Sequence, residues 1–378
     1  MRLEELSIRN IRNIEALELK PHPRLNIICG ANGAGKTNLL EAVYLLATGR
    51  SFRTANDREL IRWEGAWRAE FALAAGTISA ADGSVRQARV VISGGQKRVF
   101  LNDKQAPTLA AYWGELNAVV FTPDDLLILK GDPAKRRAFM DSELSQLNGV
   151  YLRHLQQYAQ ALRQRNALLR SGASLAAIAG QLSVWERTLS ELSVFLFRER
   201  RLRVSQLESH AKDIYTNLTD GREQLRMRYI HFLLPLSEDA SEDESDDTLK
   251  EAIAAALEEG RRADFERGFT QFGPHRDDFI VTLDGLNARH YASQGQQRSC
   301  MLAIRLAELH LFLDVKGEYP IVMLDDISSE LDERRRECLS TALPPEAQKF
   351  ITTVTPETLN LPENQERSVF WLRRGRLR

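Results

Sequence analysis

The chain has 378 residues, of which 43% are hydrophobic and 27% are charged, so it can hold two or three globular domains with a sizeable core. Its net charge of −1 argues against a protein that is basic overall and binds nucleic acid over its whole surface, but it allows a local basic patch. Three widely spaced cysteines argue against a disulfide or zinc framework and fit a reducing cytosol. The sequence begins MRLEELSIRN, without the apolar core of a signal peptide, and no window approaches about 18 consecutive apolar residues. We therefore expect a cytoplasmic protein without a membrane span.

The segment GANGAGKT follows a short apolar run, LNIIC, and matches the pattern Gly-x-x-x-x-Gly-Lys-[Ser/Thr] of a nucleotide-binding P-loop. Its glycines lack Cβ atoms, so the backbone N–H groups can turn toward phosphates at close range. Lys36 can contact the β- and γ-phosphates, and the hydroxyl of Thr37 can bind Mg²⁺. The helical pattern that follows directs the positive end of its dipole at the same anions. We predict a nucleoside triphosphate site formed by Gly30, Ala31, Asn32, Gly33, Ala34, Gly35, Lys36 and Thr37.

Strands are predicted on both sides of this loop. Residues 2–20 alternate apolar and charged positions, which predicts two antiparallel strands, and residues 67–102 predict a meander of short strands. Two arginines in GRSFRT, Arg50 and Arg53, lie close to the P-loop in sequence. They are either solvated surface side chains or contacts to phosphate or DNA.

A long helical region follows. Residues 121–141 contain two helix starts, and the pattern is helical from about 143 to 218, with a turn at residues 171–175. Apolar residues between 182 and 196 recur in steps of three and four. We predict an antiparallel helical pair that forms an arm of roughly 30–50 Å at 1.5 Å per residue. RERRLR on its second helix is either an exposed charged face or a phosphate patch, formed by Arg198, Arg200, Arg201 and Arg203.

The next segments lead back to a globular pattern. Residues 222–234 predict a strand, and residues 237–247 carry seven acidic residues in eleven, which predicts a disordered, self-repelling loop. We considered a metal site in this loop, but nothing there fixes the ligands. A helix is predicted at about 248–268, and FGPHRDDF then leads into a hairpin with an Asp284-Gly285 turn.

Two further motifs lie near the end of the chain. ASQGQQRS precedes a long amphipathic helix at residues 297–314, where a hydroxyl and backbone N–H groups could bind an anion or simply cap the helix. IVMLDD is an apolar strand that ends in two carboxylates, as a Walker B motif does. Asp325 could bind Mg²⁺, and Asp326 could orient or deprotonate the attacking water. SSELD and two apolar strands, KFITTV and SVFWL, follow.

The order of these motifs resembles the head of an ABC-type ATPase and, more narrowly, the RecF family of bacterial recombination and repair proteins. The resemblance covers nearly the whole chain and rests on GANGAGKTNLLEAVYLL, PDDLLILKGDPAKRRAFMD, FGPHRDDF, ASQGQQRSCMLAIRLAE and MLDDISSELDERRR. It implies an α/β fold, an ABC-type P-loop ATPase head with a mixed sheet and helices, into which an antiparallel helical arm is inserted. We expect the N-terminal part of the head at residues 1–120, the arm at 121–270, and the C-terminal part of the head at 271–378.

The resemblance also implies a function. RecF proteins bind ATP with Mg²⁺, form a homodimer on ATP binding, and act on DNA at single-strand gaps and at junctions between single and double strands. They cooperate with RecO and RecR in loading RecA and belong to the SOS response. For this chain the resemblance implies catalytic roles for Lys36, Asp325 and Asp326, and a weak, DNA-stimulated ATPase that serves as a conformational switch. It places a signature motif that meets the ATP of the other subunit at Ser293, Gln294, Gly295 and Gln296, D-loop residues at Ser329 and Asp332, and the switch residue at Thr353.

The chain departs from the general ABC pattern at several positions. Walker B ends in Asp-Asp rather than Asp-Glu, which agrees with slow hydrolysis because the second aspartate has a shorter reach. The signature reads Ser-Gln-Gly-Gln, and Thr352, Thr353 or Thr355 stands where a switch histidine is expected; we select Thr353. The nearest candidate for the glutamine loop is residues 122–125.

Three other classes of protein share an ABC-type head. A transporter head needs a membrane partner and does not usually carry an extended helical pair. An SMC-like tether needs a coiled coil of hundreds of residues, and this arm is far shorter. An ABC-headed nuclease needs an added catalytic domain, whereas about 46 residues follow Asp332. We therefore expect an ATP-gated clamp on DNA.

Overall fold

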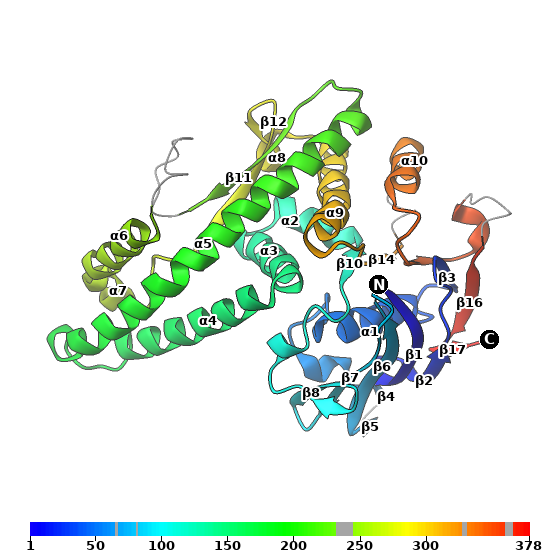
Figure 1. The fold of residues 1–378 in the computed structure, drawn as a ribbon, viewed down its shortest axis with the longest axis horizontal. Helices are drawn as coiled ribbons and strands as arrows, with labels where there is room; N and C mark the ends of the chain where they lie inside the picture. Colours follow the sequence, from blue (N-terminus) through cyan, green and yellow to red (C-terminus); the bar gives the residue numbers. More distant parts are fainter. Residues whose placement is uncertain (65–66, 81, 232–244, 327–330, 360–365) are drawn as a thin grey trace. The chain divides into compact units, whose positions relative to one another are not determined.

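The computed structural model describes residues 1–64, 67–80, 82–231, 245–326, 331–359 and 366–378 (Figure 1). The chain forms two compact units. The first unit holds residues 1–126 and 298–378, and the second holds residues 127–297. The division into functional domains at residues 120 and 270 stays a prediction. Among the described residues, no helix combines the length and the apolar character that crossing a bilayer requires.

The first unit contains a six-stranded antiparallel sheet with the strand order β2-β1-β6-β7-β8-β9. Its strands are β1 (Arg2–Ile11), β2 (Ile14–Leu19), β6 (Phe71–Ser79), β7 (Val85–Ser93), β8 (Gln96–Leu101) and β9 (Lys104–Gln105). The two strands predicted at residues 2–20 and the predicted meander are therefore confirmed. A short helix η1 (Asp57–Leu60) and a hairpin of β4 (Trp63–Glu64) and β5 (Trp67–Arg68) precede β6.

A second, mixed sheet in the same unit has the order β10-β14-β15-β3-β16-β17. Its strands are β10 (Ala118–Phe121), β14 (Ile321–Leu324), β15 (Lys349–Thr353), β3 (Leu25–Cys29), β16 (Ser368–Arg373) and β17 (Arg376–Leu377), and all neighbours pair in parallel except β16 and β17. Every residue of β3, β14 and β15 is buried, as expected of parallel strands covered on both faces. Helix α1 (Lys36–Thr48) contacts strands of both sheets (Figure 1).

The remaining helices that lie wholly or mostly in the first unit are η2 (Leu109–Ala111), η3 (Pro123–Asp125), α9 (Gln294–Lys316), α10 (Glu333–Ala342) and η5 (Pro356–Leu359). The helix predicted at residues 297–314 thus begins three residues earlier, at Gln294, because the segment before it caps the helix. The predicted strands KFITTV and SVFWL are confirmed as β15 and β16.

The second unit is mostly helical. Its helices are α2 (Leu126–Lys130, which begins at the unit boundary), α3 (Pro133–Leu147), α4 (Gly149–Leu169), α5 (Leu175–Thr219), α6 (Asp246–Glu259), α7 (Arg261–Arg267) and α8 (Ala288–Tyr291). Helices α4 and α5 pack together and confirm the predicted helical pair (Figure 1). With 45 residues, α5 is about 68 Å long at 1.5 Å per residue, so it exceeds the predicted range.

A three-stranded sheet in the second unit has the order β11-β12-β13, with β11 (Leu225–Ile230), β12 (Asp278–Leu283) and β13 (Leu286–Asn287). The predicted hairpin turn is confirmed, since Asp284 and Gly285 have φ values of 48° and 82°. The helix predicted at 248–268 is divided at Gly260, which ends α6 and begins α7. Residues 237–244 of the predicted acidic loop lie outside the described residues, whereas Asp246 and Asp247 form the first turn of α6.

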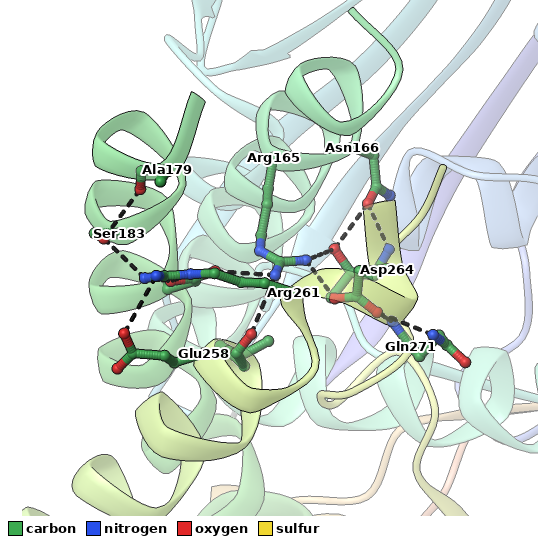
Figure 2. A network of polar contacts seen from close by, with 11 residues as sticks. Arg165, Asn166, Ala179, Ser183, Glu258, Arg261, Asp264 and Gln271 are labelled. Carbon is green, nitrogen blue, oxygen red and sulfur yellow. Dashed lines mark hydrogen bonds and ion pairs between the residues drawn. The ribbon is translucent and has the colours of Figure 1, made fainter. Parts of the chain in front are cut away.

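Buried ion pairs join the helices of the second unit (Figure 2). Arg165 of α4 is fully buried, and its guanidinium donates to Asp264 of α7 at 2.7 Å and to Glu186 of α5 at 3.0 Å. Arg261 of α7 also pairs with Glu186, at 2.6 Å. These contacts tie α4, α5 and α7 together through charge rather than through apolar packing alone.

Candidate nucleotide-binding site

The P-loop connects the buried end of β3 to the start of α1. Gly30, Gly33 and Gly35 have φ values of 155°, 78° and 109°, in the region that side chains rarely adopt. A Cβ on Gly30 would lie 2.5 Å from the carbonyl oxygen of Leu372, and one on Gly35 would lie 2.7 Å from the side-chain oxygen of Asn13. Backbone conformation therefore favours glycine at both positions, and at Gly30 the contact with a backbone oxygen excludes a Cβ as well.

Lys36, the first residue of α1, has a side chain that is only 4% exposed. Its ammonium donates to the carbonyl oxygen of Gly30 at 2.8 Å and lies 4.0 Å from a carboxylate oxygen of Asp326. The side chain thus folds back over the loop. A cation held against the loop backbone is the arrangement that phosphate binding by this motif needs.

Asp325 follows β14, and its carboxylate meets one side chain from the start of α1 and one from β15. Thr37 donates to Oδ1 of Asp325 at 2.9 Å, and Thr352 of β15 donates to the same oxygen at 2.9 Å. Asp325 is 7% exposed, and burial raises its pKa, while the two hydroxyl hydrogen bonds act in the opposite direction. The P-loop and the predicted Walker B strand therefore meet at one buried carboxylate.

These oxygens fit Mg²⁺. Mg²⁺ prefers oxygen ligands and is usually held by one or two carboxylates together with phosphates and water. The carboxylate of Asp325 forms no ion pair with any described residue, so a cation would offset the cost of its burial. No group of three or more His, Cys, Asp or Glu side chains that could hold a metal occurs within the described ranges. A metal beside Thr37 and Asp325 would therefore need oxygens from a bound phosphate.

Asp326 and the threonines of β15 complete this end of the sheet. Asp326 has a φ of 49°, and its backbone N–H donates to the hydroxyl of Thr352 at 2.8 Å. Thr352, which the sequence offered as an alternative to Thr353, thus bridges both aspartates. The hydroxyl of Thr353 donates to the carbonyl oxygen of Thr355 at 3.1 Å, and its switch role stays a prediction.

A buried glutamate on α1 was missed by the sequence analysis. Glu41 is fully buried and accepts two hydrogen bonds of 2.9 Å from Arg12 and one of 2.5 Å from Ser51. A single charge inside the apolar helix LLEAVYLLA was the available signal, because a buried carboxylate needs a partner. This cluster fixes the turn between β1 and β2 against the helix that carries the P-loop lysine.

The two arginines that follow α1 are exposed but have contacts. Arg53 donates to the side-chain oxygen of Asn38 at 2.9 Å and lies 3.5 Å from Glu41. Arg50 lies over the ring of Trp113, with 5.0 Å from its guanidinium carbon to the ring centroid. Both arginines stay predictions as DNA contacts.

The predicted signature residues lie at the start of α9, in a part of the chain that belongs to the second unit. Ser293 and Gln296 cap each other, since Gln296 N–H donates to the Ser293 hydroxyl at 3.2 Å and Ser293 N–H donates to the Gln296 side chain at 2.6 Å. Gln296 also donates to Glu223 at 2.7 Å. Gln294 and Gly295 complete the first turn, and a role of these four residues toward a second subunit stays a prediction.

The structure places Asp332 of the predicted D-loop at a helix cap and residues 122–125, the glutamine-loop candidate, in a buried ion cluster. Ser329 lies outside the described residues, and Asp332 caps α10 by accepting from Arg335 N–H at 2.9 Å. In residues 122–125, Asp125 is buried and accepts two hydrogen bonds of 3.0 and 2.8 Å from Arg305. Arg305 also donates to Glu308, whose pKa burial raises to about 7. The glutamine-loop candidate is therefore part of a buried ion cluster.

One DNA candidate is corrected by the structure. Arg200 is 1% exposed and donates to Tyr151, to the carbonyl oxygen of Pro274, and to Asp141 and Asp277. A side chain enclosed in this way joins α5 to α3 and to FGPHRDDF, and it cannot reach DNA. Of its neighbours, Arg198 pairs with Asp246, Arg203 contacts Glu199 and Gln206, and Arg201 is half-buried; their DNA role stays a prediction.

FGPHRDDF, which the sequence analysis used as a family motif, holds the second unit together. His275 makes hydrogen bonds with the hydroxyl of Tyr158 at 2.6 Å and with the carbonyl oxygen of Thr270 at 3.0 Å. Because a carbonyl only accepts, Nε2 of His275 donates to Thr270 and Nδ1 accepts from Tyr158. Asp278 accepts two hydrogen bonds from Arg136, at 2.6 and 2.8 Å. The motif therefore supplies buried polar contacts to the base of the arm.

Comparisons with known proteins agree with this architecture. Residues 2–374 match the family model described as RecF/RecN/SMC N terminal domain. The DNA replication and repair protein RecF of Halalkalibacterium halodurans is 36% identical over 378 residues, covering 100% of this chain and 99% of that protein. The protein of the same name from Staphylococcus carnosus is 38% identical over 361 residues, covering 95% of each.

Solved structures give the same result. A structure of the recombination mediator protein RecF with ATP, in the RecFOR pathway, has a TM-score of 0.86 and 28% identity, and it covers 100% of this chain and 98% of that chain. An Smc head bound to the C-terminal winged-helix domain of ScpA has a TM-score of 0.55 and 14% identity, which shows a shared fold alone. The predicted fold class, an ABC-type ATPase head with an inserted helical arm, is confirmed.

Proposed function

Because the chain belongs to the RecF family of DNA replication and repair proteins, we propose that it is an ATP-controlled DNA-binding protein of recombinational repair. The observation that carries the proposal is the hydrogen bond of 2.9 Å between Thr37 and Asp325. These residues are 288 positions apart, and the fold brings them together at the carboxyl ends of β3 and β14. That edge of a parallel sheet is where nucleotides bind in α/β folds.

Within this proposal, the residues of the site have distinct roles. The backbone of residues 30–37 and the ammonium of Lys36 bind the phosphates of ATP. Thr37 and Asp325 would hold Mg²⁺, which when bound would neutralise negative charge on the phosphates. Asp326 orients water, and its short side chain agrees with a weak ATPase. Slow hydrolysis would then set how long the ATP-bound state lasts.

ATP also acts between subunits in this proposal. Ser293, Gln294, Gly295 and Gln296 contact the γ-phosphate held by a second copy of the chain, so ATP joins two subunits and hydrolysis separates them. The exposure of Ser293 at the start of a 23-residue helix supports this role, because the helix dipole favours anions at that end. Ser329, Asp332 and Thr353 would then respond to the presence of the γ-phosphate.

We propose that ATP binding and hydrolysis control the binding of DNA. The RecF proteins solved with bound nucleotide are described as recombination mediators of the RecFOR pathway, which supports RecO and RecR as partners. As the family resemblance implies, we propose gapped duplexes and junctions as substrates and the loading of RecA as the shared task. We place this activity in the cytoplasm and in the SOS response. Arg50, Arg53, Arg198, Arg201 and Arg203 remain its predicted DNA contacts.

The first test measures binding to a labelled gapped duplex by fluorescence anisotropy at fixed salt, with and without ATP and Mg²⁺. Binding that appears with ATP and fades as ATP is consumed is the expected result. Binding that is indifferent to nucleotide would refute the switch. Lys36→Ala should lower ATP affinity by about 10- to 100-fold, because it removes a charge-assisted contact.

The second test separates ATP binding from dimerisation. Ser293→Arg should keep ATP affinity and abolish the ATP-induced dimer in sedimentation, and a mixture with Lys36→Ala should recover one working site. Because Ser293 is also a helix cap, Ser174→Arg is the matched control: Ser174 caps α5 in the same way, accepting from the N–H of Ala177. A dimer that is lost equally in both variants would point to helix destabilisation, and a dimer that persists in both would contradict the signature role.

A further inference from the structure

The hairpin of β16 and β17 lies in a segment that is rich in arginine. Residues 367–378 contain five arginines and no acidic residue. Arg373 pairs with Arg376 across the hairpin, and Leu372 pairs with Leu377. Arg378 N–H donates to the carbonyl oxygen of Trp371, so the ladder continues to that pair. Because side chains alternate along strands, one face of the hairpin presents Trp371, Arg373, Arg376 and Arg378, which we call the hairpin face.

The hairpin face is open to solvent and its charge is largely uncompensated. Trp371 is 44% exposed, and the three arginines of the face are exposed as well. Arg373, Arg374 at the turn, and Arg378 form no ion pair with the part of the chain that the structure describes, whereas Arg376 pairs with Glu15 at 2.9 Å. In the arm, Arg165 and Arg200 are buried, and Arg198 pairs with Asp246. A polyanion is the ligand whose charge complements this face.

The exposed indole of Trp371 indicates which class of polyanion the hairpin face binds. Arginines around an exposed indole form the combination that binds single-stranded nucleic acid, where phosphates meet the arginines and an unpaired base stacks on the ring. In a duplex the bases stack on one another, so the indole would gain nothing. We propose that the hairpin face binds single-stranded nucleic acid, with a base on Trp371 and phosphates on Arg373, Arg376 and Arg378. The inference rests on the proposed function, for which it supplies a DNA contact.

The same hairpin contacts the nucleotide site. Gly375, at its turn, donates from its backbone N–H to the carbonyl oxygen of Ala34 in the P-loop, at 2.8 Å. The carbonyl oxygen of Leu372 packs against Gly30 so closely that no Cβ fits there. Single-stranded nucleic acid bound to the hairpin face could therefore shift the backbone of the P-loop, which is the predicted phosphate site. Any effect of nucleic acid on ATP affinity must then be matched by an equal effect of ATP on nucleic-acid affinity.

The test uses the full chain and a fluorescent oligonucleotide of twenty thymidines, titrated by anisotropy over a range of salt concentrations. Arg373→Ala with Arg378→Ala should lower affinity by about 25-fold at 0.1 M salt and reduce the slope of log K against log salt by about 1.4, since each single-strand phosphate contact contributes about 0.7. Trp371→Leu should lower affinity by roughly 5- to 150-fold with little change in slope. Arg2→Ala with Arg98→Ala, which changes two exposed arginines elsewhere in the first unit, should have no such effect.

The outcomes separate this inference from the proposed function. If the wild-type chain binds the oligonucleotide and the hairpin variants bind it equally well, the hairpin face is refuted while DNA binding stands. If the wild-type chain binds neither this oligonucleotide nor the gapped duplex, the proposed function fails. A blunt duplex with the same number of phosphates tests the stacking, and an equal loss of duplex affinity in Trp371→Leu would refute a base on the indole. Retained binding of fluorescent ATP by each variant shows that it is folded.

Discussion

The ion-pair network in the second unit leads to a stability prediction for which the chain contains its own control (Figure 2). Arg165 and Asp264 are both fully buried and are joined at 2.7 Å. Asp264 also accepts from the backbone N–H and the side chain of Gln271, at 3.0 and 3.2 Å. Glu186, the second acid that contacts Arg165, keeps its contacts to Arg261 when Arg165 is removed. Arg165→Met therefore leaves one carboxylate, that of Asp264, buried without a cation.

Removing one partner of a buried pair costs about 3–5 kcal/mol, because the remaining charge stays desolvated. For a unit of this size, about 2–4 °C is lost per kcal/mol, so the melting temperature should fall by roughly 6–20 °C. Replacing both partners by apolar side chains removes the uncompensated charge and is often close to neutral. We therefore expect Arg165→Met with Asp264→Leu to be more stable than Arg165→Met alone.

Urea and thermal unfolding of the full chain, followed by far-ultraviolet circular dichroism at a helix band, would measure these changes. The control is Lys250→Met, which removes an ion pair to Glu191 of the same length, 2.7 Å, whose partners are 39% and 51% exposed. Its loss should stay below about 1 kcal/mol, because exposed pairs contribute little. Equal losses in the buried and exposed variants, or additive losses in the double variant, would refute the reasoning from burial.

Three further predictions concern single residues. Thr352→Val removes the hydroxyl that orients Asp325, so kcat for ATP hydrolysis should fall by about 2- to 12-fold with KM nearly constant, and Thr352→Ser should restore it. Burial lowers the pKa of His275 to about 4, so the folded state binds fewer protons than the unfolded state between about pH 4 and 6.5. Stability should then fall by up to roughly 3 kcal/mol as pH drops through this window, and His275→Gln should flatten the pH profile of unfolding. Gly375→Ala should lower both thermal stability and ATP affinity, because the residue has a φ of 75° and a backbone carbonyl oxygen occupies the place of a Cβ. Gly83→Ala is the control, since Gly83 has a φ of 79° but open space around it. It should lower stability only through backbone strain and leave ATP affinity unchanged.

The local structure of the P-loop was predictable because its residues are consecutive in sequence. A buried strand, a glycine loop and a helix follow one another without interruption, so the positions of Gly30 and Lys36 are set within a few residues. Pairing Thr37 with Asp325 required one more step, since both follow buried strands whose carboxyl ends share an edge of the sheet. In the structure the two side chains form a hydrogen bond of 2.9 Å, and their role as Mg²⁺ ligands stays a prediction.

The burial of Arg200 could not be predicted from the local sequence. RERRLR has the composition of a charged surface, and nothing within it indicates which arginine faces inward. The partners of Arg200 lie 59 positions away at Asp141 and 77 positions away at Asp277, so its burial depends on tertiary packing. Glu41 gave a better signal, because one charge stood alone in an apolar helix. Its main partner, Arg12, is supplied by a strand turn 29 positions earlier.

Arginine thus has two roles in this chain: it stabilises the fold where carboxylates surround it, and it can bind a ligand where no carboxylate is near. Arg165 and Arg200 are enclosed with acids from other helices or loops, and their charge stabilises the fold instead of attracting a ligand. Arg373 and Arg378 lie where the described chain offers no acid to pair with them, so their counterions come from solvent. Releasing such counterions favours the binding of a polyanion. Under this proposal, a chain with a net charge of −1 binds DNA through one small face, which is distinguished by unpaired arginines next to an exposed tryptophan rather than by total charge.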